Sequence, residues 1–92
     1  MSLQVELLSL PINYAVVQLP ERNFPGVVIQ GDTLNALVQQ LERMVGLLTA
    51  NQTDELAAEI EDMREQLSDV VAHYESVCAK CGITLPYRRS SL

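Results

Sequence analysis

The chain has 92 residues, of which 48% are hydrophobic and 4% aromatic, and its formal charge is −6. This length allows one modest core and no second one, and the negative charge disfavours binding to the phosphate backbone of nucleic acids. The apolar runs are short and no basic segment precedes them at the start, so the sequence predicts neither a membrane span nor a signal peptide. We therefore expect a cytoplasmic location.

Three segments at the start of the chain have the pattern of β-strands. Residues 3–10 alternate apolar and polar side chains over their first five positions, and Pro11 closes the segment. Residues 14–19 and 26–30 are rich in Val and Ile. The connection between these two segments fits a hairpin loop and is too short for a parallel crossover. The sequence therefore predicts a three-stranded antiparallel sheet.

A first helix is expected after residues 31–33, where the hydrophobic period changes from two to about three and a half. Asp32 or Thr33 is expected to cap it, and it should end near Leu48. One row of its apolar residues is spaced alternately by four and three. That row consists of Leu34, Val38, Leu41, Val45 and Leu48; Leu37 and Met44 complete the apolar face of this helix, and Met44 is expected in the core.

The second helix is longer, with Thr53 as its expected cap and Gly82 as the left-handed residue at its far end. It carries an uninterrupted apolar row with the same spacing: Leu56, Ile60, Met63, Leu67, Val70, Tyr74, Val77 and Cys81. Two helices joined by so short a turn pack antiparallel. We therefore expect an α+β fold, with a single domain over residues 1–85 and a flexible tail over residues 86–92.

The first helix is too short to cover the whole apolar row of the second. The row therefore overhangs beyond Asp69, and the overhanging residues are Val70, Tyr74, Val77 and Cys81. They either fold over the sheet or pair with a second copy of the chain. We expect a mixture of both and a homodimer, because a small domain gains stability most readily by association.

Residues 51–77 carry eight acidic side chains against the single base Arg64. Such a surface either serves solubility or attracts a basic protein partner. The residues expected to contact that partner are Glu55, Glu59, Asp62, Glu65 and Asp69.

His73, Cys78 and Cys81 form the one arrangement that could carry chemistry, since two cysteines three positions apart can share a zinc ion. However, five helical residues place His73 and Cys78 roughly 140° apart around the axis. The helix C-terminus also disfavours a reactive thiolate. We therefore expect these cysteines to be structural, with no metal or cofactor. No catalytic constellation is recognisable, and we expect a protein that is not an enzyme.

Residues 24–37 resemble the strand-to-helix corner of HicB-type antitoxins, which neutralise a small partner toxin through a compact, partial ribonuclease-H-like sheet. Because a long acidic helix stands where that family returns to a further strand, DNA binding is not carried over. Over residues 13–17, 24–33 and 82–87 the chain also resembles a family of small uncharacterised bacterial proteins. That resemblance implies a bacterial origin and no activity.

These observations predict a protein–protein interaction module. The first hypothesis is an antitoxin-like or immunity-like binder whose acidic helix docks on a basic partner. One alternative is a structural homodimer held by the overhanging row, and another is a metal or redox site at Cys78 and Cys81. Binding of nucleic acid or membrane is not expected.

Overall fold

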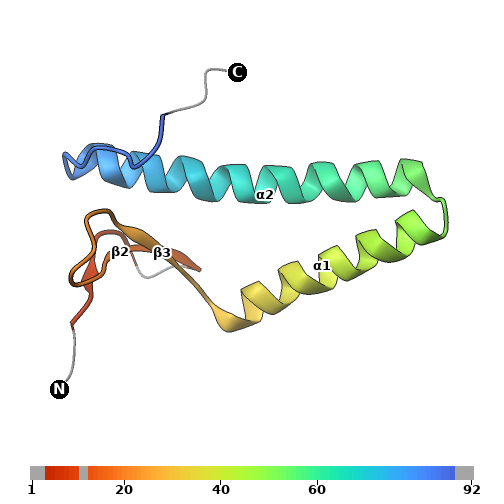
Figure 1. Cartoon of the computed structure of the whole chain (residues 1–92), viewed down its shortest axis with the longest axis horizontal. Helices are drawn as coiled ribbons and strands as arrows, with labels where there is room; N and C mark the ends of the chain where they lie inside the picture. The colour runs from red at the N-terminus through yellow and green to blue at the C-terminus, as the bar shows by residue number, and fades with distance from the viewer. Residues whose placement is uncertain (1–3, 11–12, 89–92) are drawn as a thin grey trace. The chain divides into compact units, whose positions relative to one another are not determined.

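The computed structural model describes residues 4–10 and 13–88, and it divides the chain into two compact units. The sheet unit comprises Met1–Ile29 and Val71–Leu92, and the hairpin unit comprises Gln30–Val70. A three-stranded antiparallel sheet comes first in the chain and two helices follow it. The predicted α+β fold is therefore confirmed (Figure 1).

The sheet consists of β1 (Glu6–Leu7), β2 (Tyr14–Gln18) and β3 (Gly26–Ile29), in the order β1-β2-β3. Both pairings are antiparallel, and Val16 of β2 lies opposite Val27 of β3. The three middle residues of β2 are buried, whereas β1 is exposed. The central strand therefore supplies most of the buried surface of the sheet.

The first strand is shorter than the predicted segment 3–10, and a serine side chain accounts for this. The Leu8 N–H donates to the Val16 carbonyl at 2.8 Å, which continues the ladder. The Val16 N–H, however, donates to Ser9 Oγ at 2.8 Å. Because a side-chain oxygen takes the place of a backbone carbonyl, regular pairing stops here. Leu3 and Pro11, the expected limits of this strand, lie outside the described residues.

The two helices are α1 (Gly31–Thr49) and α2 (Thr53–Lys80). The N-cap of α1 is Gln30, whose side chain makes no capping hydrogen bond. Asp32 Oδ1 instead accepts the N–H of its neighbour Thr33 at 2.8 Å, inside the first turn. The N-cap is therefore Gln30 and not Asp32 or Thr33, because the chain turns helical before these residues, but Asp32 does accept one of the free N–H groups of the first turn, as predicted.

The turn between the helices depends on a left-handed residue, Asn51, at φ 62°. Its N–H donates to the Leu48 carbonyl at 3.1 Å, which closes the end of α1. The next carbonyl, of Gln52, accepts the Leu56 N–H at 3.0 Å and so opens α2. The cap of α2 thus lies one residue before Thr53, the residue that the sequence indicated.

The end of α2 is a Schellman motif centred on Gly82, whose φ of 69° confirms the expected left-handed residue. The Gly82 N–H donates to the Ala79 carbonyl at 3.2 Å, and the Ile83 N–H donates to the Cys78 carbonyl at 2.8 Å. This reversal brings Ile83 back to pack against the core of the sheet unit. The chain after the helix therefore contributes to the core.

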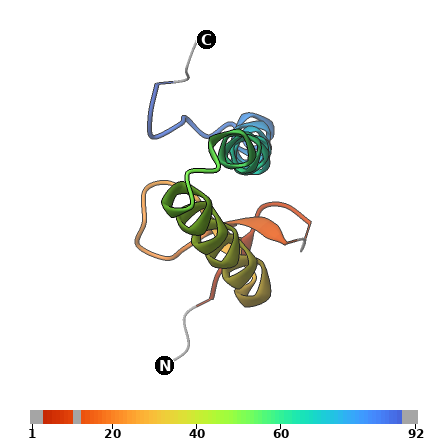
Figure 2. The same cartoon turned by 90° about the vertical axis from the view of Figure 1, so that its right-hand side faces the viewer.

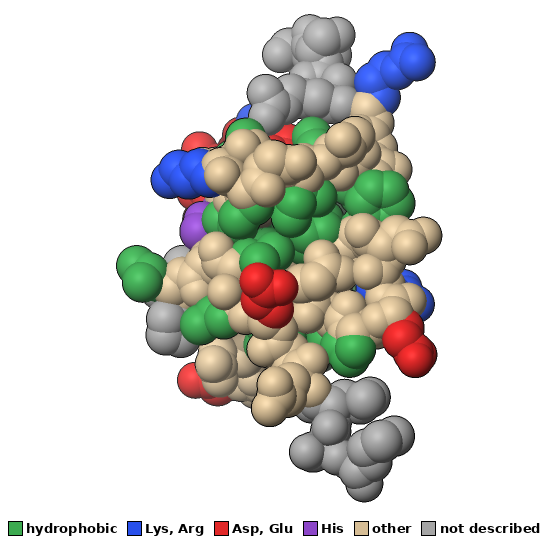
Figure 3. Space-filling model, turned by 90° about the vertical axis from the view of Figure 1, so that its left-hand side faces the viewer, with side chains coloured by type: hydrophobic (Ala, Val, Ile, Leu, Met, Phe, Trp, Pro, Cys, Tyr) green, Lys and Arg blue, Asp and Glu red, His purple; other side chains and the backbone are tan. Residues whose placement is uncertain are grey.

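The core of the sheet unit contains Val16, Tyr74, Val77 and Cys78, with Val16 and Cys78 fully buried. A band of hydrophobic side chains is visible in Figure 3, which faces this part of the chain. Partly buried residues pack around the core, namely Leu8, Val27, Ile83 and Leu85. The last turns of α2 and the sheet therefore share one core.

In the hairpin unit the packing differs from the prediction. The predicted α1 row points outward: Leu34, Val38, Leu41, Val45 and Leu48 are between 44% and 63% exposed. The less exposed positions form the neighbouring row, which consists of Thr33, Leu37, Gln40, Met44 and Leu47. Only Gln40 and Met44 of this unit's described residues are buried. The expected row on α1 is thus displaced by one residue, although Met44, which was expected in the core, is buried there.

Candidate functional site

The helical hairpin has two chemically different faces. In Figures 1 and 2, α1 and the first part of α2 run in opposite directions on either side of the turn. In an α-helix, one residue further along the chain is about 100° further around the axis. We call a position inward when its residue faces the other helix of the hairpin. Because the helices are antiparallel, the residues one position after the inward positions point to the same side of the hairpin in both helices. Residues that precede the inward positions point to the opposite side.

One side is the apolar face. It consists of the α1 row Leu34, Val38, Leu41, Val45 and Leu48, together with Ile60 and Leu67 of α2. Ile60 is 50% exposed and Leu67 is 43% exposed, although both were predicted to lie in the seam of the hairpin. Arg64 stands between them at helical spacing and pairs with Glu61, its Nε lying 3.0 Å from Oε2. The hydrogen bonds from Arg64 lower the pKa of the Glu61 carboxyl.

The other side is the acidic face. On α2 the residues that face α1 include the half-buried Leu56, Met63 and Val70, together with Gln66, which bonds to Gln40. The members of the acidic face each precede one of these residues, and all four are exposed: Glu55, Asp62, Glu65 and Asp69. A groove of about 330 Å³ opens on this side, lined by Arg43, Leu47, Glu55, Ala58, Glu59 and Asp62. Because residues from both helices line it, the groove supports the assignment of these positions to one side. Four of the five acids predicted as a contact surface therefore share a face.

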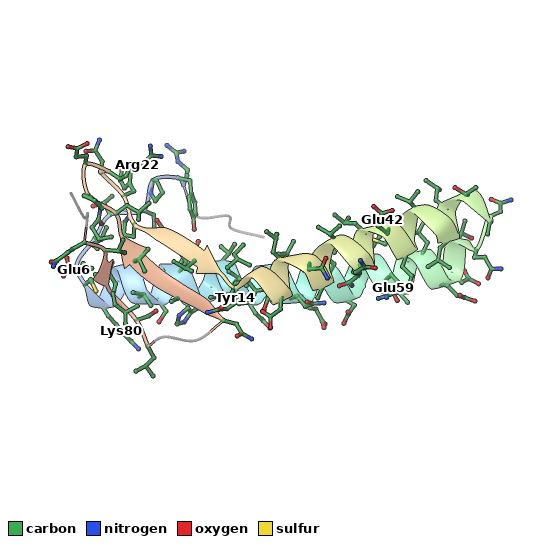
Figure 4. The ribbon with its side chains drawn as sticks, turned by 90° about the horizontal axis from the view of Figure 1, so that it is seen from below. Glu6, Tyr14, Arg22, Glu42, Glu59 and Lys80 are labelled. Carbon is green, nitrogen blue, oxygen red and sulfur yellow. The ribbon has the colours of Figure 1, made fainter. Side chains whose placement is uncertain are left out.

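Glu59, the fifth predicted acid, is half-buried at the seam of the hairpin. Its Oε2 lies 3.4 Å from Nη2 of Arg43, on the opposite helix. Figure 4 shows Glu59 on α2 and Glu42 on α1. Since Glu59 is engaged within the hairpin, it contributes less to an external surface than the other acids.

A polar network joins the two helices at their buried seam. Gln40 is 6% exposed, and its Nε2 donates to the Glu59 carbonyl at 3.3 Å and to Asp62 Oδ2 at 3.2 Å. In turn, Gln66 Nε2 donates to Gln40 Oε1 at 3.1 Å and to Asp62 Oδ2 at 3.1 Å. A buried polar residue of this kind fixes the register of paired helices. Sequence reasoning missed Gln40, because its row contains fewer apolar residues than the adjacent one.

The predicted overhang is used mostly within the chain. Tyr74 and Val77 are 8% and 7% exposed in the core of the sheet unit, and Val70 is half-buried. Cys81 is exposed, whereas Cys78 is fully buried. The seam prediction is therefore corrected at its end, where Cys78 takes the place of Cys81. The sheet covers Tyr74 and Val77, so a second copy meets them only if this core opens.

The cysteines also lie in different environments. Both are free thiols, and the described residues contain no group of three or more metal-binding side chains. A groove of about 460 Å³ between the β1 region and the end of α2 is lined by Leu7, Leu8, Ser9, Leu10, His73, Val77, Lys80 and Cys81. Figure 4 labels Glu6 on β1 and Lys80 at this end of α2. His73 Nε2 is buried, and no other described residue forms a hydrogen bond with it. The lining therefore offers one imidazole and one exposed thiol.

Taken together, the sheet, the hairpin and its two faces define a small α+β protein with an open helical surface. The chain belongs to DUF6959, a family of unknown function whose model matches residues 1–87. The predicted membership of an uncharacterised family is thereby confirmed. No curated protein and no solved structure matches the chain. The local resemblance to HicB-type antitoxins is therefore not supported by these comparisons.

Within the described residues, neither helix is long and apolar enough to cross a membrane.

Proposed function

We propose that the chain is a protein–protein interaction module that presents the acidic face of its hairpin to a basic protein. The observation that carries the proposal is the arrangement of Glu55, Asp62, Glu65 and Asp69 along one side of α2. Their carboxylates are exposed and lie opposite the apolar face, so a partner can contact Glu55, Glu65 and Asp69 without disturbing the hairpin packing, whereas Asp62 also accepts hydrogen bonds within the hairpin. An antitoxin-like or immunity-like binder fits this description.

The acidic face suits a partner with clustered Lys or Arg side chains. The groove on this side offers carboxylates from α2 beside Leu47 and Ala58, so it combines charge with a small apolar floor. Electrostatic attraction over such a surface accelerates association and weakens as the salt concentration rises. The proposal therefore implies binding that depends strongly on salt.

The experiment is a charge reversal at Glu55, Glu65 and Asp69, all replaced by Lys. These three positions are chosen because none of them forms an ion pair with another described residue, whereas Glu59 and Asp62 hold the hairpin together. The matched control reverses three exposed carboxylates elsewhere, Glu6, Glu21 and Glu42. Both variants change the net charge equally, and only their positions differ.

Proteins captured by the tagged wild type are quantified by mass spectrometry against both variants. We expect a basic protein that the wild type and the control retain and that the acidic-face variant loses. Circular dichroism checks that both variants stay helical. If all three proteins captured the basic protein equally, or if both variants lost it equally, the acidic face would not be the surface that binds it.

A further inference from the structure

We infer that the apolar face of the hairpin is covered by a second copy of the chain, so that two hairpins form a four-helix bundle. The face consists of Leu34, Val38, Leu41, Val45, Leu48, Ile60 and Leu67, and all seven residues are at least 43% exposed in the single chain. The inference concerns a different surface from the acidic face and does not depend on a basic partner.

The choice of inward row on α1 favours a second copy of the chain as the occupant of the apolar face. Two rows with heptad spacing run side by side along this helix, and the row that faces α2 includes the polar residues Thr33 and Gln40. The row that faces outward is entirely aliphatic. Two helices alone cannot enclose a core, and here the more apolar row is left outside it. An uninterrupted aliphatic row at this spacing is the pattern by which helices pack in bundles.

The area of the apolar face is close to what one side of a dimer buries. If each of the seven side chains keeps roughly 80 Å² exposed, the face offers on the order of 550 Å² of apolar surface. That area lies near the upper end of the range found for the largest exposed apolar patch on a typical monomer. A specific interface buries about 800 Å² on each partner, with an apolar centre and a polar rim. The apolar face and the polar residues around it therefore match what one side of a stable dimer needs.

The distribution of charge also favours pairing through the apolar face. In a two-fold symmetric dimer the same surface meets itself, so an acidic surface would be repelled. The rows of the apolar face contain no carboxylate; Arg64, in the α2 row, is paired with Glu61 on the same helix, and Glu42 flanks the α1 row at its outer edge. Pairing through this face leaves both acidic faces on the outside. A basic partner, by contrast, finds no carboxylate on the apolar face to attract it.

The test begins with the mass of the wild-type protein in solution, measured by sedimentation over a wide range of protein concentration. We expect a species of twice the 10.2 kDa of one chain. We also expect a melting temperature that rises with protein concentration, because dissociation accompanies unfolding. A wild-type protein that stays monomeric at every concentration overturns the inference, whatever other protein it captures.

The variant Val38→Glu with Val45→Glu places two carboxylates in the centre of the apolar face, and we expect a monomer. The matched control, Ala36→Glu with Gln39→Glu, adds the same charge to exposed positions of the same helix on the other side. We expect the control to stay dimeric. A dimer that survives the first pair of substitutions overturns the inference.

Leu41→Ala is the second variant, for the case that Val38→Glu with Val45→Glu does not fold. It keeps a good helix former and removes one aliphatic contact, so we expect the dimer dissociation constant to rise about tenfold or more. An unchanged constant contradicts the inference. Charge reversal at Glu55, Glu65 and Asp69 should leave the dimer intact, so failure of the acidic-face proposal and failure of this inference are distinguishable.

Discussion

The Tyr74 hydroxyl donates a hydrogen bond to the Pro25 carbonyl at 2.9 Å, which joins two residues 49 positions apart. Both residues are buried in the sheet unit, so neither group has water as an alternative partner. Tyr74→Phe leaves the Pro25 carbonyl unpaired, and we expect the free energy of unfolding to fall by about 1–2 kcal/mol. Urea unfolding followed by circular dichroism measures it. Tyr14→Phe, at a half-buried position, is the control and should change stability by less than about 0.5 kcal/mol.

A second prediction concerns alkaline pH. Burial raises the pKa of Tyr74, and the neighbouring Cys78 thiol adds to the effect. The folded chain therefore holds the Tyr74 proton to a higher pH than the unfolded chain does. This stabilisation is complete below the ordinary tyrosine pKa of about 10 and is lost as the pH rises through the higher folded pKa. We expect urea midpoints to fall more steeply for the wild type than for Tyr74→Phe over roughly pH 9 to 11. Parallel profiles would contradict this.

Two glycine-to-alanine substitutions, at Gly46 and at Gly82, are expected to change the stability of the protein in opposite directions. A Cβ atom added at Gly46 or at Gly82 meets no other atom within 4 Å, so space does not distinguish them. Backbone conformation does, since Gly82 has φ 69° and Gly46 lies inside α1. We expect Gly82→Ala to cost about 1–2 kcal/mol and Gly46→Ala to gain about 1 kcal/mol. Thermal unfolding at one fixed protein concentration measures both changes in stability. If both substitutions changed the stability in the same direction, this would count against the Schellman motif at Gly82.

Gln40 is expected to contribute more to helix register than to stability. In Gln40→Leu its exposed partners Asp62 and Gln66 can bond to water, and the leucine packs beside Met44. We therefore expect the free energy of unfolding to rise by about 1 kcal/mol. Gln39→Leu, at the exposed neighbouring position, controls for added hydrophobicity and should have little effect. A lower stability of Gln40→Leu would show that the hydrogen bonds of this side chain outweigh apolar packing.

The two thiols should differ in reactivity. Cys81 is exposed and Cys78 is fully buried, so a thiol reagent is expected to modify one cysteine per folded chain quickly and the other only as the core opens. Cys81→Ser should remove the fast phase, and Cys78→Ser should keep it. Zinc added beforehand should leave the fast rate unchanged. Protection of both thiols by zinc would support the metal-site alternative instead.

The sequence was sufficient to predict the order and type of the elements. The β-rich composition of β2 and β3, the left-handed Gly82 and the short inter-helix turn each depend on local chemistry, and the structure agrees with them within a residue or so. The exception is β1, where one serine hydroxyl replaces a ladder partner. Such an exchange depends on which strand lies alongside, which the local pattern does not reveal.

The rotation of α1 could not be predicted for a similar reason. Its two adjacent rows both have heptad spacing, and hydrophobicity favours the row that begins at Leu34. The structure uses the other row, because Gln40 finds Asp62 and Gln66 on the opposite helix. A polar residue is acceptable at a seam only when the facing helix supplies its partners. The residues that decide this rotation, Gln40 on α1 and its partners Asp62 and Gln66 on α2, are more than 20 positions apart in the sequence.

The division of the chain into two units has a consequence for the order of folding. The hairpin unit is one continuous stretch, Gln30–Val70, whereas the sheet unit is completed by residues on both sides of it. On a ribosome the strands emerge first, yet Tyr74, Val77 and Cys78 follow more than 40 residues after β3. Contacts between distant residues form slowly because a long loop must close first. The apolar side of the sheet therefore waits uncovered until α2 is nearly complete, and this interval is when the nascent chain is most exposed to aggregation or to a chaperone.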